Sequence, residues 1–510
     1  MSADINCVSL ETAPHQRVSC FAGAAAVLLF CALLTLFGTL TLGSGPVHPD
    51  MTEAWAWGKE FQLGYDKHPP FAAWVAGAWL SVMPRTDCSF YLLASINAGA
   101  GLVGVWWLAS LLLGPRDRWV AVLLLVLTPY FTFWALKFNA NAPLLSTWPW
   151  ATYFFVRSLL THRLAPSALA GAICGMALLT KYSSVVLFAA MLLAALSHPN
   201  RFGYFRSLAP AVTVWVALAV FAPHIWWAVQ ADFPTVKYAA SKTHFPFAMA
   251  KMHTISATLG SIAAGGIALA ACGIAYGTSM RPMLATLRSS LSDRSLAWLA
   301  VLAVAPFLIT IATNVLANVR VSSGFLFPVF FAVPIAFLAL SHAPSTDAVV
   351  RRLCICVMAV WLPLLLAAPF VDQYAVWAGT PSAAAPTKDV AVAATKVWRA
   401  TFGQPLRYVA GTRALATAAT FYSPDAPSLV VFDDPSGSPW TTPAMVAQHG
   451  LLIICRASDA GCIAHATAMA GHDALRYWDR FKSSGKGGAR AEHAFLFTLL
   501  PPANAVTLWD

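Results

Sequence analysis

Residues 47–70 read VHPDMTEAWAWGKEFQLGYDKHPP and follow directly after an apolar run over residues 21–42. That run is long enough to cross a bilayer as a single helix, so the polar segment begins at a membrane boundary. Asp50 and Glu53 stand three residues apart, which places both carboxylates on one face of a helical turn. Ionisable groups are costly to hold at such a boundary, so the cluster predicts a functional site. A solvated loop between two spans is the alternative interpretation.

The composition of the whole chain is that of a polytopic membrane protein. Of its 510 residues, 58% are hydrophobic and only 10% are charged, against roughly 25% charged residues in a soluble domain. The net charge of +11 comes from short basic clusters between apolar runs, as expected of cytoplasmic loops. Because no basic stripe is interleaved with stacking aromatics, nucleic-acid binding is not expected.

Apolar runs of about 20 residues recur along the chain and predict about eleven transmembrane helices. Arginine-rich connections alternate with connections rich in histidine and aromatics, so the positive-inside tendency places the N-terminus in the cytoplasm and the C-terminus outside. The first run lacks a small-residue cleavage site and is expected to remain as a helix. The predicted helix centres are Leu29, Gly101, Leu125, Tyr153, Ala172, Ala190, Ala217, Ile267, Val304, Val333 and Met358.

Hydropathy falls near the C-terminus and divides the chain into two predicted domains. Residues 1–371 form the transmembrane domain, whose first exported loop covers residues 43–90, and residues 372–510 form an exported domain. In the second domain, strand-like runs such as LLIICR (451–456) alternate with helix-like runs, which predicts a small α/β fold. Its length of about 140 residues is enough for one independent core.

Cysteine usage predicts one cross-link at most. Most of the ten cysteines lie in apolar runs, where cysteine behaves as a small hydrophobe. No CxxC pair has a matching partner, so a zinc or redox framework is not expected. Cys455 and Cys462 lie in the predicted exported domain, where an oxidising compartment would favour a disulfide between them.

Four further polar clusters fall in turns that the predicted topology places on the same side as the first exported loop. They suit a substrate with an anionic head and a hydrocarbon tail, because cations hold a lipid phosphate at the interface while its tail lies among the helices. A carboxylate beside that phosphate could deprotonate an incoming hydroxyl, a contribution of about 10²–10⁴ in rate. The clusters contain Lys137, Asn139 and Asn141; Lys181; His224, Trp226, Trp227, Asp232, Lys237, Tyr238, Lys242 and His244; and Arg320.

Each cluster also has a structural interpretation. Lys181 and Arg320 could simply extend to the lipid headgroups. Asn139 and Asn141 could cap the following helix, which is the favoured interpretation of those two residues alone.

A metal site is a weaker hypothesis. His48 with Asp50, and Asp66 with His68, form HxD and DxH pairs that could bind a divalent cation. Their spacing does not fix a coordination geometry, so no residue is assigned to a metal. No cofactor is predicted, and a divalent metal stays an open alternative.

The ordered series YDKHPPF, LKFNANAPLL, LLTKYSSV and PHIWWAVQADFPTVKY resembles membrane glycosyltransferases of the GT-C fold. The similar families are the bacterial ones related to protein O-mannosyltransferases and to the aminoarabinose transferase of lipid A. The resemblance covers roughly residues 21–370. The C-terminal part is similar to their exported accessory domains only in outline. The resemblance implies an α-helical, polytopic GT-C fold followed by a small α/β domain.

The resemblance also implies roles for individual residues. An acid at the start of the first exported loop is catalytic or orients the acceptor in this family, and Asp50 matches it. Glu53 takes the place of a second acid that is often adjacent, although two residues intervene here. His68, with Lys67 beside it, matches a residue before the Pro-Pro pair that helps hold the donor phosphate.

The turn before the fourth helix departs from the family pattern. Relatives commonly have an acid there, whereas this chain has Asn139 and Asn141, and a neutral amide cannot act as a general base. Lys181 matches a lysine typical of bacterial relatives and is expected to contact phosphate or to be structural. The predicted site residues are Asp50 and Glu53 for catalysis; Lys67, His68, Lys181 and Arg320 for the donor phosphate; and Tyr65, Asn139, Asn141, Lys237 and Tyr238 for substrate.

The implied activity is transfer of a sugar from a polyprenyl-phosphate donor to a lipid, glycan or protein acceptor, with inversion at the anomeric carbon. It would occur on the periplasmic side of a bacterial inner membrane, where lipid-linked donors replace nucleotide sugars. The main alternative is a lipid or lipid-linked-sugar transporter (flippase), which predicts charges within several helices and two matching halves. A third interpretation is a non-enzymatic assembly subunit that binds through its exported domain.

Overall fold

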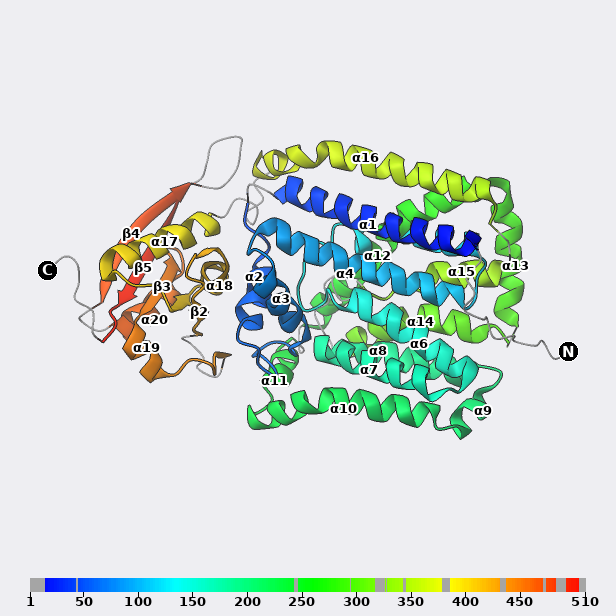
Figure 1. The fold of residues 1–510 in the computed structure, drawn as a ribbon, viewed down its shortest axis with the longest axis horizontal. Helices are drawn as coiled ribbons and strands as arrows, with labels where there is room; N and C mark the ends of the chain where they lie inside the picture. The colour runs from blue at the N-terminus through cyan, green and yellow to red at the C-terminus, as the bar shows by residue number, and fades with distance from the viewer. Residues whose placement is uncertain are drawn as a thin grey trace.

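The chain folds into a long helical part and a smaller part that contains a β-sheet at one end of it (Figure 1). The two termini lie at opposite ends of the molecule. The computed structural model describes residues 14–42, 45–242, 246–293, 295–316, 326, 328–342, 345–377, 386–431, 437–470, 474–482 and 492–503. We call residues 14–377 the helical part and residues 386–503 the C-terminal part.

The helices of the helical part run mostly along its long axis. Their bounds are α1 Pro14–Leu42, α2 Pro49–Gly58, α3 Phe71–Val82, α4 Asp87–Ser110, α5 Pro115–Val126, η1 Pro129–Phe131, α6 Leu144–Thr161, α7 Leu164–Thr180, η2 Tyr182–Ser184, α8 Val185–Ser197, α9 Arg201–Arg206, α10 Ala209–Gln230, α11 Pro234–Ala240, α12 Phe247–Tyr276, η3 Gly277–Ser279, α13 Met280–Ser292, α14 Ala297–Leu316, α15 Val333–Ser341 and α16 Asp347–Trp377.

Each of the eleven predicted helix centres falls within one of these helices. Within the described residues, six helical segments are long and apolar enough to cross a membrane unaided, and the remaining centres lie in shorter or more polar helices. Helix α16 continues to Trp377, six residues past the predicted domain boundary at residue 371. The six segments are Gly23–Thr41, Asp87–Ser110, Ala209–Gln230, Ala248–Ser292, Ala297–Leu316 and Asp347–Val371.

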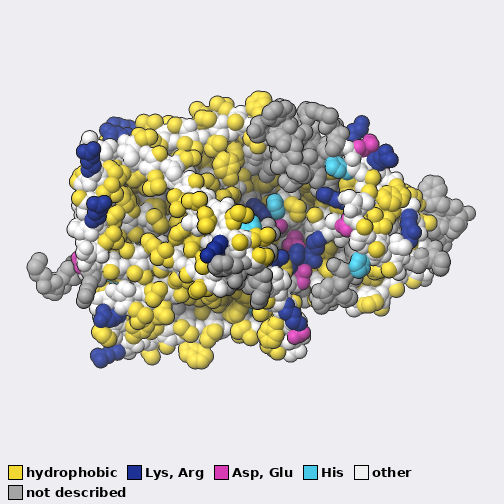
Figure 2. All heavy atoms as spheres, turned by 180° about the vertical axis from the view of Figure 1, so that it is seen from behind, with side chains coloured by type: hydrophobic (Ala, Val, Ile, Leu, Met, Phe, Trp, Pro, Cys, Tyr) yellow, Lys and Arg dark blue, Asp and Glu magenta, His cyan; other side chains and the backbone are white. Residues whose placement is uncertain are grey.

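The surface of the helical part separates apolar from charged side chains. Figure 2 shows a broad hydrophobic band, with Lys and Arg at the end far from the C-terminal part and mixed charges where the two parts meet. This distribution is the one expected of a multi-pass membrane protein whose ends lie in water. Short helices α2, α3 and α11 lie at the mixed-charge end, beside the C-terminal part.

The C-terminal part is a five-stranded sheet with helices on both faces. Its strand order is β2-β1-β3-β5-β4, with β1 parallel to β2 and β3, and β5 antiparallel to β3 and β4. The bounds are α17 Thr387–Phe402, β1 Tyr408–Gly411, α18 Arg413–Tyr422, β2 Ser428–Leu429, α19 Pro443–His449, β3 Leu451–Arg456, α20 Ala460–Ala470, β4 Leu475–Lys482 and β5 Glu492–Leu500.

The central strand β3 has both of its faces buried, as its unbroken apolar sequence predicts. Leu452 and Ile454 pack with residues of α17 and α18, whereas Ile453 and Cys455 pack toward α20. A disulfide joins Cys455 to Cys462 of α20, with their Cα atoms 5.7 Å apart. The predicted α/β fold and the predicted disulfide are both confirmed.

Candidate active site

Helix α2 carries Asp50 and Glu53, the two carboxylates that the sequence predicts to be catalytic. Its first turn is fixed by sequence, because Pro49 is pre-organised for the first helical position and the Nδ1 atom of His48 accepts a hydrogen bond from the Asp50 amide at 3.1 Å. The helix packs between α3 of the helical part and α18 of the C-terminal part. Gly58 and Gly77 allow the contact with α3, since a Cβ on Gly77 would lie 2.3 Å from the Gly58 carbonyl oxygen.

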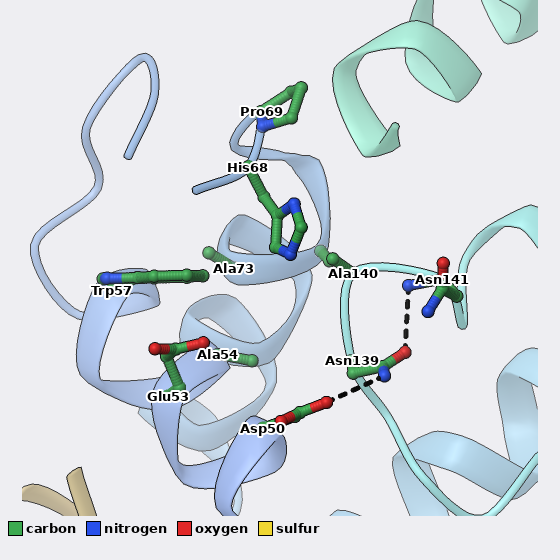
Figure 3. A pocket seen from close by; sticks show the side chains of 11 residues that line it. Asp50, Glu53, Ala54, Trp57, His68, Pro69, Ala73, Asn139, Ala140 and Asn141 are labelled. Carbon is green, nitrogen blue, oxygen red and sulfur yellow. Dashed lines mark hydrogen bonds between the residues drawn. The ribbon is translucent and has the colours of Figure 1, made fainter. Parts of the chain in front are cut away.

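A polar pocket of about 450 Å³, open to solvent, lies beside α2 (Figure 3). It is formed by α2, the segment before α3, the first turn of α3 and the turn before α6. Asp50, His68 and the two asparagines come together here from three separate stretches of chain, as the sequence predicted for one membrane face. The lining residues are Asp50, Glu53, Ala54, Trp57, His68, Pro69, Ala72, Ala73, Asn139, Ala140 and Asn141.

Asp50 is held by basic and amide groups. Its Oδ2 atom lies 2.8 Å from Lys137 Nζ and accepts a hydrogen bond from Asn139 Nδ2 at 3.2 Å, and its Oδ1 atom lies 3.6 Å from His48. Burial raises the pKa of the Asp50 carboxyl, but Lys137, His48 and Asn139 together outweigh burial and hold the pKa below its ordinary value. The carboxylate is therefore ionised at neutral pH and still 43% exposed to solvent.

The turn before α6 connects Asp50 to Lys181. Asn139 Oδ1 accepts a hydrogen bond from the Asn141 amide at 2.9 Å, and Asn141 Oδ1 accepts one from Lys181 Nζ at 2.5 Å. Helix α6 has Pro143 at its N-cap and no side-chain cap, so the prediction that these asparagines cap the helix is wrong. Instead, their amides place Asp50 and Lys181 on the two sides of one turn.

Lys181 lies in the turn between α7 and η2, where it is largely removed from water. Burial lowers the pKa of the Lys181 ammonium group, and the positive charge of Lys137 lowers it further. The negative charge of Asp50 raises it, and the resulting pKa is about 8. The side chain therefore carries its charge at neutral pH but begins to lose it in mildly alkaline solution. A bound anion would favour the charged form.

His68 projects into the pocket from the segment before α3 (Figure 3). Its ring meets Trp57 and Tyr238 edge to face, with centroid separations of 6.2 and 5.6 Å. Burial, together with the positive charges of Lys181 and Lys67, lowers the pKa of the imidazole to about 3. At neutral pH the ring is uncharged, so it would meet a phosphate as a hydrogen-bond donor and not as a cation.

Glu53 belongs to a charged cluster that we define as Lys67, Glu53, Arg413 and Asp66. Lys67 Nζ lies 2.7 Å from Glu53 Oε1, and Arg413 Nε donates to the same oxygen at 2.9 Å. Arg413 also donates from its terminal nitrogen to Asp66 Oδ1 at 3.1 Å. Glu53 is only 12% exposed and is neutralised by two cations, whereas Asp50 faces the open pocket. The two carboxylates thus share a helix and a pocket but have different surroundings.

A buried hydrogen-bonded network fixes the segments around the pocket. His224 Nδ1 donates to the Leu63 carbonyl oxygen at 2.7 Å, which leaves Nε2 to accept from the Tyr182 hydroxyl at 2.6 Å. That hydroxyl also contacts Thr235 Oγ1 at 2.6 Å. The network joins the segment that contains Leu63, the turn after Lys181 and helices α10 and α11. Hydrogen bonds therefore explain why these polar clusters of the sequence lie together.

The remaining predicted residues lie at different distances from the pocket. Tyr65 is buried beneath it, stacked on Trp57 with a centroid separation of 5.2 Å, and its hydroxyl donates to the Trp57 carbonyl oxygen at 2.8 Å. Tyr238 faces His68 from α11, whereas Lys237 points to an exposed ion pair with Asp232. Arg320 lies outside the described residues.

Two site residues were missing from the predicted set. Lys137 was recognised in its cluster but was not assigned a role, although it makes the shortest contact to Asp50. Arg413 had no sequence signal, because it lies in the C-terminal part and meets Glu53 across 360 positions of chain. Within the described part of the chain, no three His, Cys, Asp or Glu side chains gather to hold a metal ion, so the HxD and DxH pairs find no further ligand there.

A second, apolar cavity of about 790 Å³ lies among α1, α2, α4, α16 and residues 133–137. His48 and Lys137, which both contact Asp50, also line it, so the cavity ends beside the carboxylate. The complete lining is Phe37, Thr41, His48, Met51, Tyr91, Phe133, Leu136, Lys137, Leu364, Ala367 and Val371.

The sequence is similar to membrane glycosyltransferases over part of its length. A family model described as dolichyl-phosphate-mannose-protein mannosyltransferase matches residues 67–227. The lipopolysaccharide core galacturonosyltransferase RgtB of Rhizobium johnstonii is 30% identical over 204 residues, which cover 38% of this chain and 40% of that protein. The chain thus matches less than half the length of this relative.

The fold is similar to solved structures over nearly the whole chain. ArnT from Cupriavidus metallidurans, in a crystal structure with undecaprenyl phosphate bound, matches with a TM-score of 0.62 at 14% identity, covering 94% of this chain and 98% of that one. The apo structure of the same protein gives a TM-score of 0.61 at 14% identity, with coverages of 93% and 98%. The resemblance to the GT-C membrane glycosyltransferases is confirmed, and the chain has an ArnT-like GT-C fold.

Proposed function

We propose that this protein is an inverting glycosyltransferase that moves a sugar from a polyprenyl-phosphate donor to a lipid or glycan acceptor. A protein acceptor is the alternative within the same activity. The site would face the periplasm from a bacterial inner membrane, with the C-terminal part also on that side. The observation that carries the proposal is Asp50, an exposed carboxylate that lines a polar pocket and contacts His48 and Lys137 of an apolar cavity.

The chemistry follows from the position of this carboxylate. An acceptor hydroxyl that hydrogen-bonds to Asp50 would attack the anomeric carbon, forming the new C–O bond as the bond to the phosphate oxygen breaks. The proton of the hydroxyl passes to Asp50, and the bonding electrons leave with the polyprenyl phosphate. Because the pKa of Asp50 is below its ordinary value, it is a weak base that orients the hydroxyl and takes the proton late in the step.

The leaving phosphate requires positive charge, and the pocket supplies an excess of it. Four cations (Lys67, Lys137, Lys181 and Arg413) surround three carboxylates (Asp50, Glu53 and Asp66). The neutral His68 lines the pocket and Lys181 donates to the lining residue Asn141, so both could meet phosphate oxygens. Such preorganised donors stabilise the charge that develops in the transition state.

The lipid nature of a substrate is supported by the apolar cavity. Its walls suit a hydrocarbon chain, and its position brings the head of that chain to Asp50. Undecaprenyl phosphate is bound in one of the similar ArnT structures, and RgtB is named for transfer to the lipopolysaccharide core. These likenesses support a polyprenyl-phosphate donor and a lipid or glycan acceptor.

The orientation is supported by charge and by the disulfide. Lys and Arg gather at the end of the helical part far from the site, as cytoplasmic loops do. The Cys455–Cys462 disulfide at the other end suits an oxidising compartment such as the periplasm. The flippase alternative predicts charges along the spans, whereas the face in Figure 2 shows a hydrophobic band between charged ends.

Asp50→Asn tests the proposal most directly. The amide keeps the size and hydrogen bonding of the side chain but cannot accept a proton, so transfer should fall by about 10²–10⁴ while protein level is unchanged. The assay uses the purified full chain with undecaprenyl-phosphate galacturonic acid and lipopolysaccharide core, alongside mass spectrometry of envelope glycans from a deletion strain.

Asp347→Asn provides the matched control. Asp347 is 82% exposed and pairs with Arg116 at the start of α16, the end of that helix away from the C-terminal part. This variant should transfer sugar at the wild-type rate. A fully active Asp50→Asn protein would show that the carboxylate is not catalytic, and a glycan profile unaltered by deletion would favour transport.

A further inference from the structure

The C-terminal part reaches the candidate site through one charged side chain, Arg413. Its guanidinium group bridges Glu53 and Asp66, with N–O distances of 2.9 and 3.1 Å, and lies 5.5 Å from the centroid of the Trp57 ring. Both carboxylates belong to the first exported loop, which precedes Arg413 by about 350 residues in the chain. The bridge therefore connects the two parts of the molecule next to the pocket.

The core of the C-terminal part determines the position of Arg413. It is the first residue of α18, and the preceding Thr412 donates from its amide to the Ile454 carbonyl oxygen at 3.1 Å and from its hydroxyl to Asp459 at 2.8 Å. A basic residue in the first turn faces the positive end of the helix dipole, which is unfavourable for the helix. The stability of α18 does not explain this arginine, whereas its two carboxylate partners do.

We propose that Arg413 is a positioning residue of the glycosyltransferase site, through which the C-terminal part holds the donor-binding segment in place. Arg413 fixes Asp66 directly and Lys67 through their shared partner Glu53. His68, which lines the pocket, follows these two residues in sequence. The proposal rests on the proposed function, because it assigns donor binding to the pocket that His68 lines.

The geometry explains why an arginine is required here. A guanidinium group has several donors in a fixed plane and can bind two carboxylates at once, whereas a lysine ammonium is a single point charge. Without Arg413, Asp66 would lose its ion-pair partner and Glu53 would keep only Lys67. The backbone of residues 59–70 would then lose its ion-pair support at Asp66, whereas the bonds from His224 Nδ1 to the Leu63 carbonyl oxygen at 2.7 Å and from the Tyr65 amide to the His68 carbonyl oxygen at 3.2 Å would remain.

The test compares Arg413→Ala with Arg85→Ala in the purified full chain. Arg85 also joins the two parts, because it donates to the carbonyl oxygens of Phe421 and Ser423 at 3.1 and 3.2 Å, but it has no contact with the charged cluster. Arg413→Ala should raise the KM for undecaprenyl-phosphate sugar about tenfold or more and change kcat by less than about threefold. Arg413→Lys should fall between the wild type and Arg413→Ala. Arg85→Ala should keep the wild-type KM.

A purely structural role would give a different result. If Arg413 only docks the C-terminal part, Arg413→Ala and Arg85→Ala should both lower the amount of active protein. The apparent kcat would then fall while the KM for the donor stays constant, and this outcome overturns the proposal. Asp66→Asn should raise the donor KM in the wild type but add little to Arg413→Ala, since both substitutions break one bridge. If the effects of Asp66→Asn and Arg413→Ala on the donor KM were fully additive, that result would also contradict the proposed role of Arg413.

Hydrogen exchange separates this proposal from the activity itself. Amides of residues 65–68 should exchange at least about tenfold faster in Arg413→Ala than in the wild type and Arg85→Ala, because the ion-pair support at Asp66 is lost. If the wild type transfers no sugar, the proposed function fails, and faster exchange still shows that Arg413 positions the segment. Unchanged exchange overturns the positioning role whether or not the protein transfers sugar.

Discussion

At the scale of single residues, burial decides what each basic group in the pocket can do. His68 lines the pocket beside Asp50, Lys181 contacts the lining residue Asn141, and their pKa values are lowered to about 3 and about 8. The same physical cause leaves the lysine charged at neutral pH and the histidine neutral. Under the proposed function, the donor phosphate would meet Lys181 as a cation that lies close to its titration point.

The pKa of Lys181 predicts an alkaline limit to donor binding. Its ammonium is charged below pH 8 and loses the proton as the pH rises through 8, so attraction for the phosphate falls on the alkaline side. The KM for the lipid-linked donor should rise about tenfold between pH 7 and pH 9. Lys181→Arg, whose charge persists, should remove this rise; an identical rise in that variant would assign the titration to another group.

Asp50 could be found from the sequence, whereas its electrostatic surroundings could not. An acid that follows a span within a few residues is visible in the order of the chain. Its partner Lys137 lies in another turn, and the pairing depends on how α2 and the turn before α6 approach each other. Arg413 shows the same limit more strongly, since no periodicity or spacing relates it to Glu53.

At the scale of elements, α2 depends on close packing on both of its sides. Its contact with α3 brings two backbones together at Gly58 and Gly77, and its contact with α18 includes a hydrogen bond from Trp55 Nε1 to the Thr420 carbonyl oxygen at 2.9 Å. Hydropathy could predict α3 as an apolar segment. It could not predict that α2 and α3 touch at two glycines, which depends on the tertiary crossing of the helices.

Gly77→Ala should displace α2 and weaken the site. The added methyl would lie 2.3 Å from the Gly58 carbonyl oxygen, and backbone atoms on both sides cannot move aside easily. We expect a loss of about 1–3 kcal/mol in the free energy of unfolding and a clear loss of transfer. Thermal unfolding in detergent and the transfer assay measure both.

Gly260→Ala is the control for this change. A Cβ at Gly260 in α12 meets nothing within 4 Å, so the substitution should be neutral or should stabilise the helix by up to about 1 kcal/mol. If the two alanine variants behave alike, the α2–α3 contact is not limiting.

At the scale of the whole molecule, two parts with different sequence character build one site. Apolar run length located all eleven helix centres, and the strand-like run at residues 451–456 located β3. These features follow from local patterns of burial. The apolar cavity among α1, α2, α4 and α16 does not, because it depends on gaps between helices that are individually unremarkable in sequence.

The cavity predicts a dependence on the length of the lipid chain. Ala367→Trp should fill part of it and raise the KM for a donor with a full polyprenyl chain about tenfold, with a smaller effect on a short-chain analogue. Leu366→Trp changes the preceding residue of α16, whose side chain is 66% exposed, and should leave both KM values unchanged. Equal effects on long and short chains would place the hydrocarbon tail elsewhere.

The bridge from Arg413 to Glu53 also has a consequence for biosynthesis. A ribosome adds about 5–20 residues per second, so roughly 20–70 s separate the synthesis of these two residues. Under the proposed orientation, the loop of the nascent chain would reach its final side of the bilayer during that interval without its partner. The catalytic centre is therefore completed late in translation, and a prematurely terminated chain would insert into the membrane without becoming a finished enzyme.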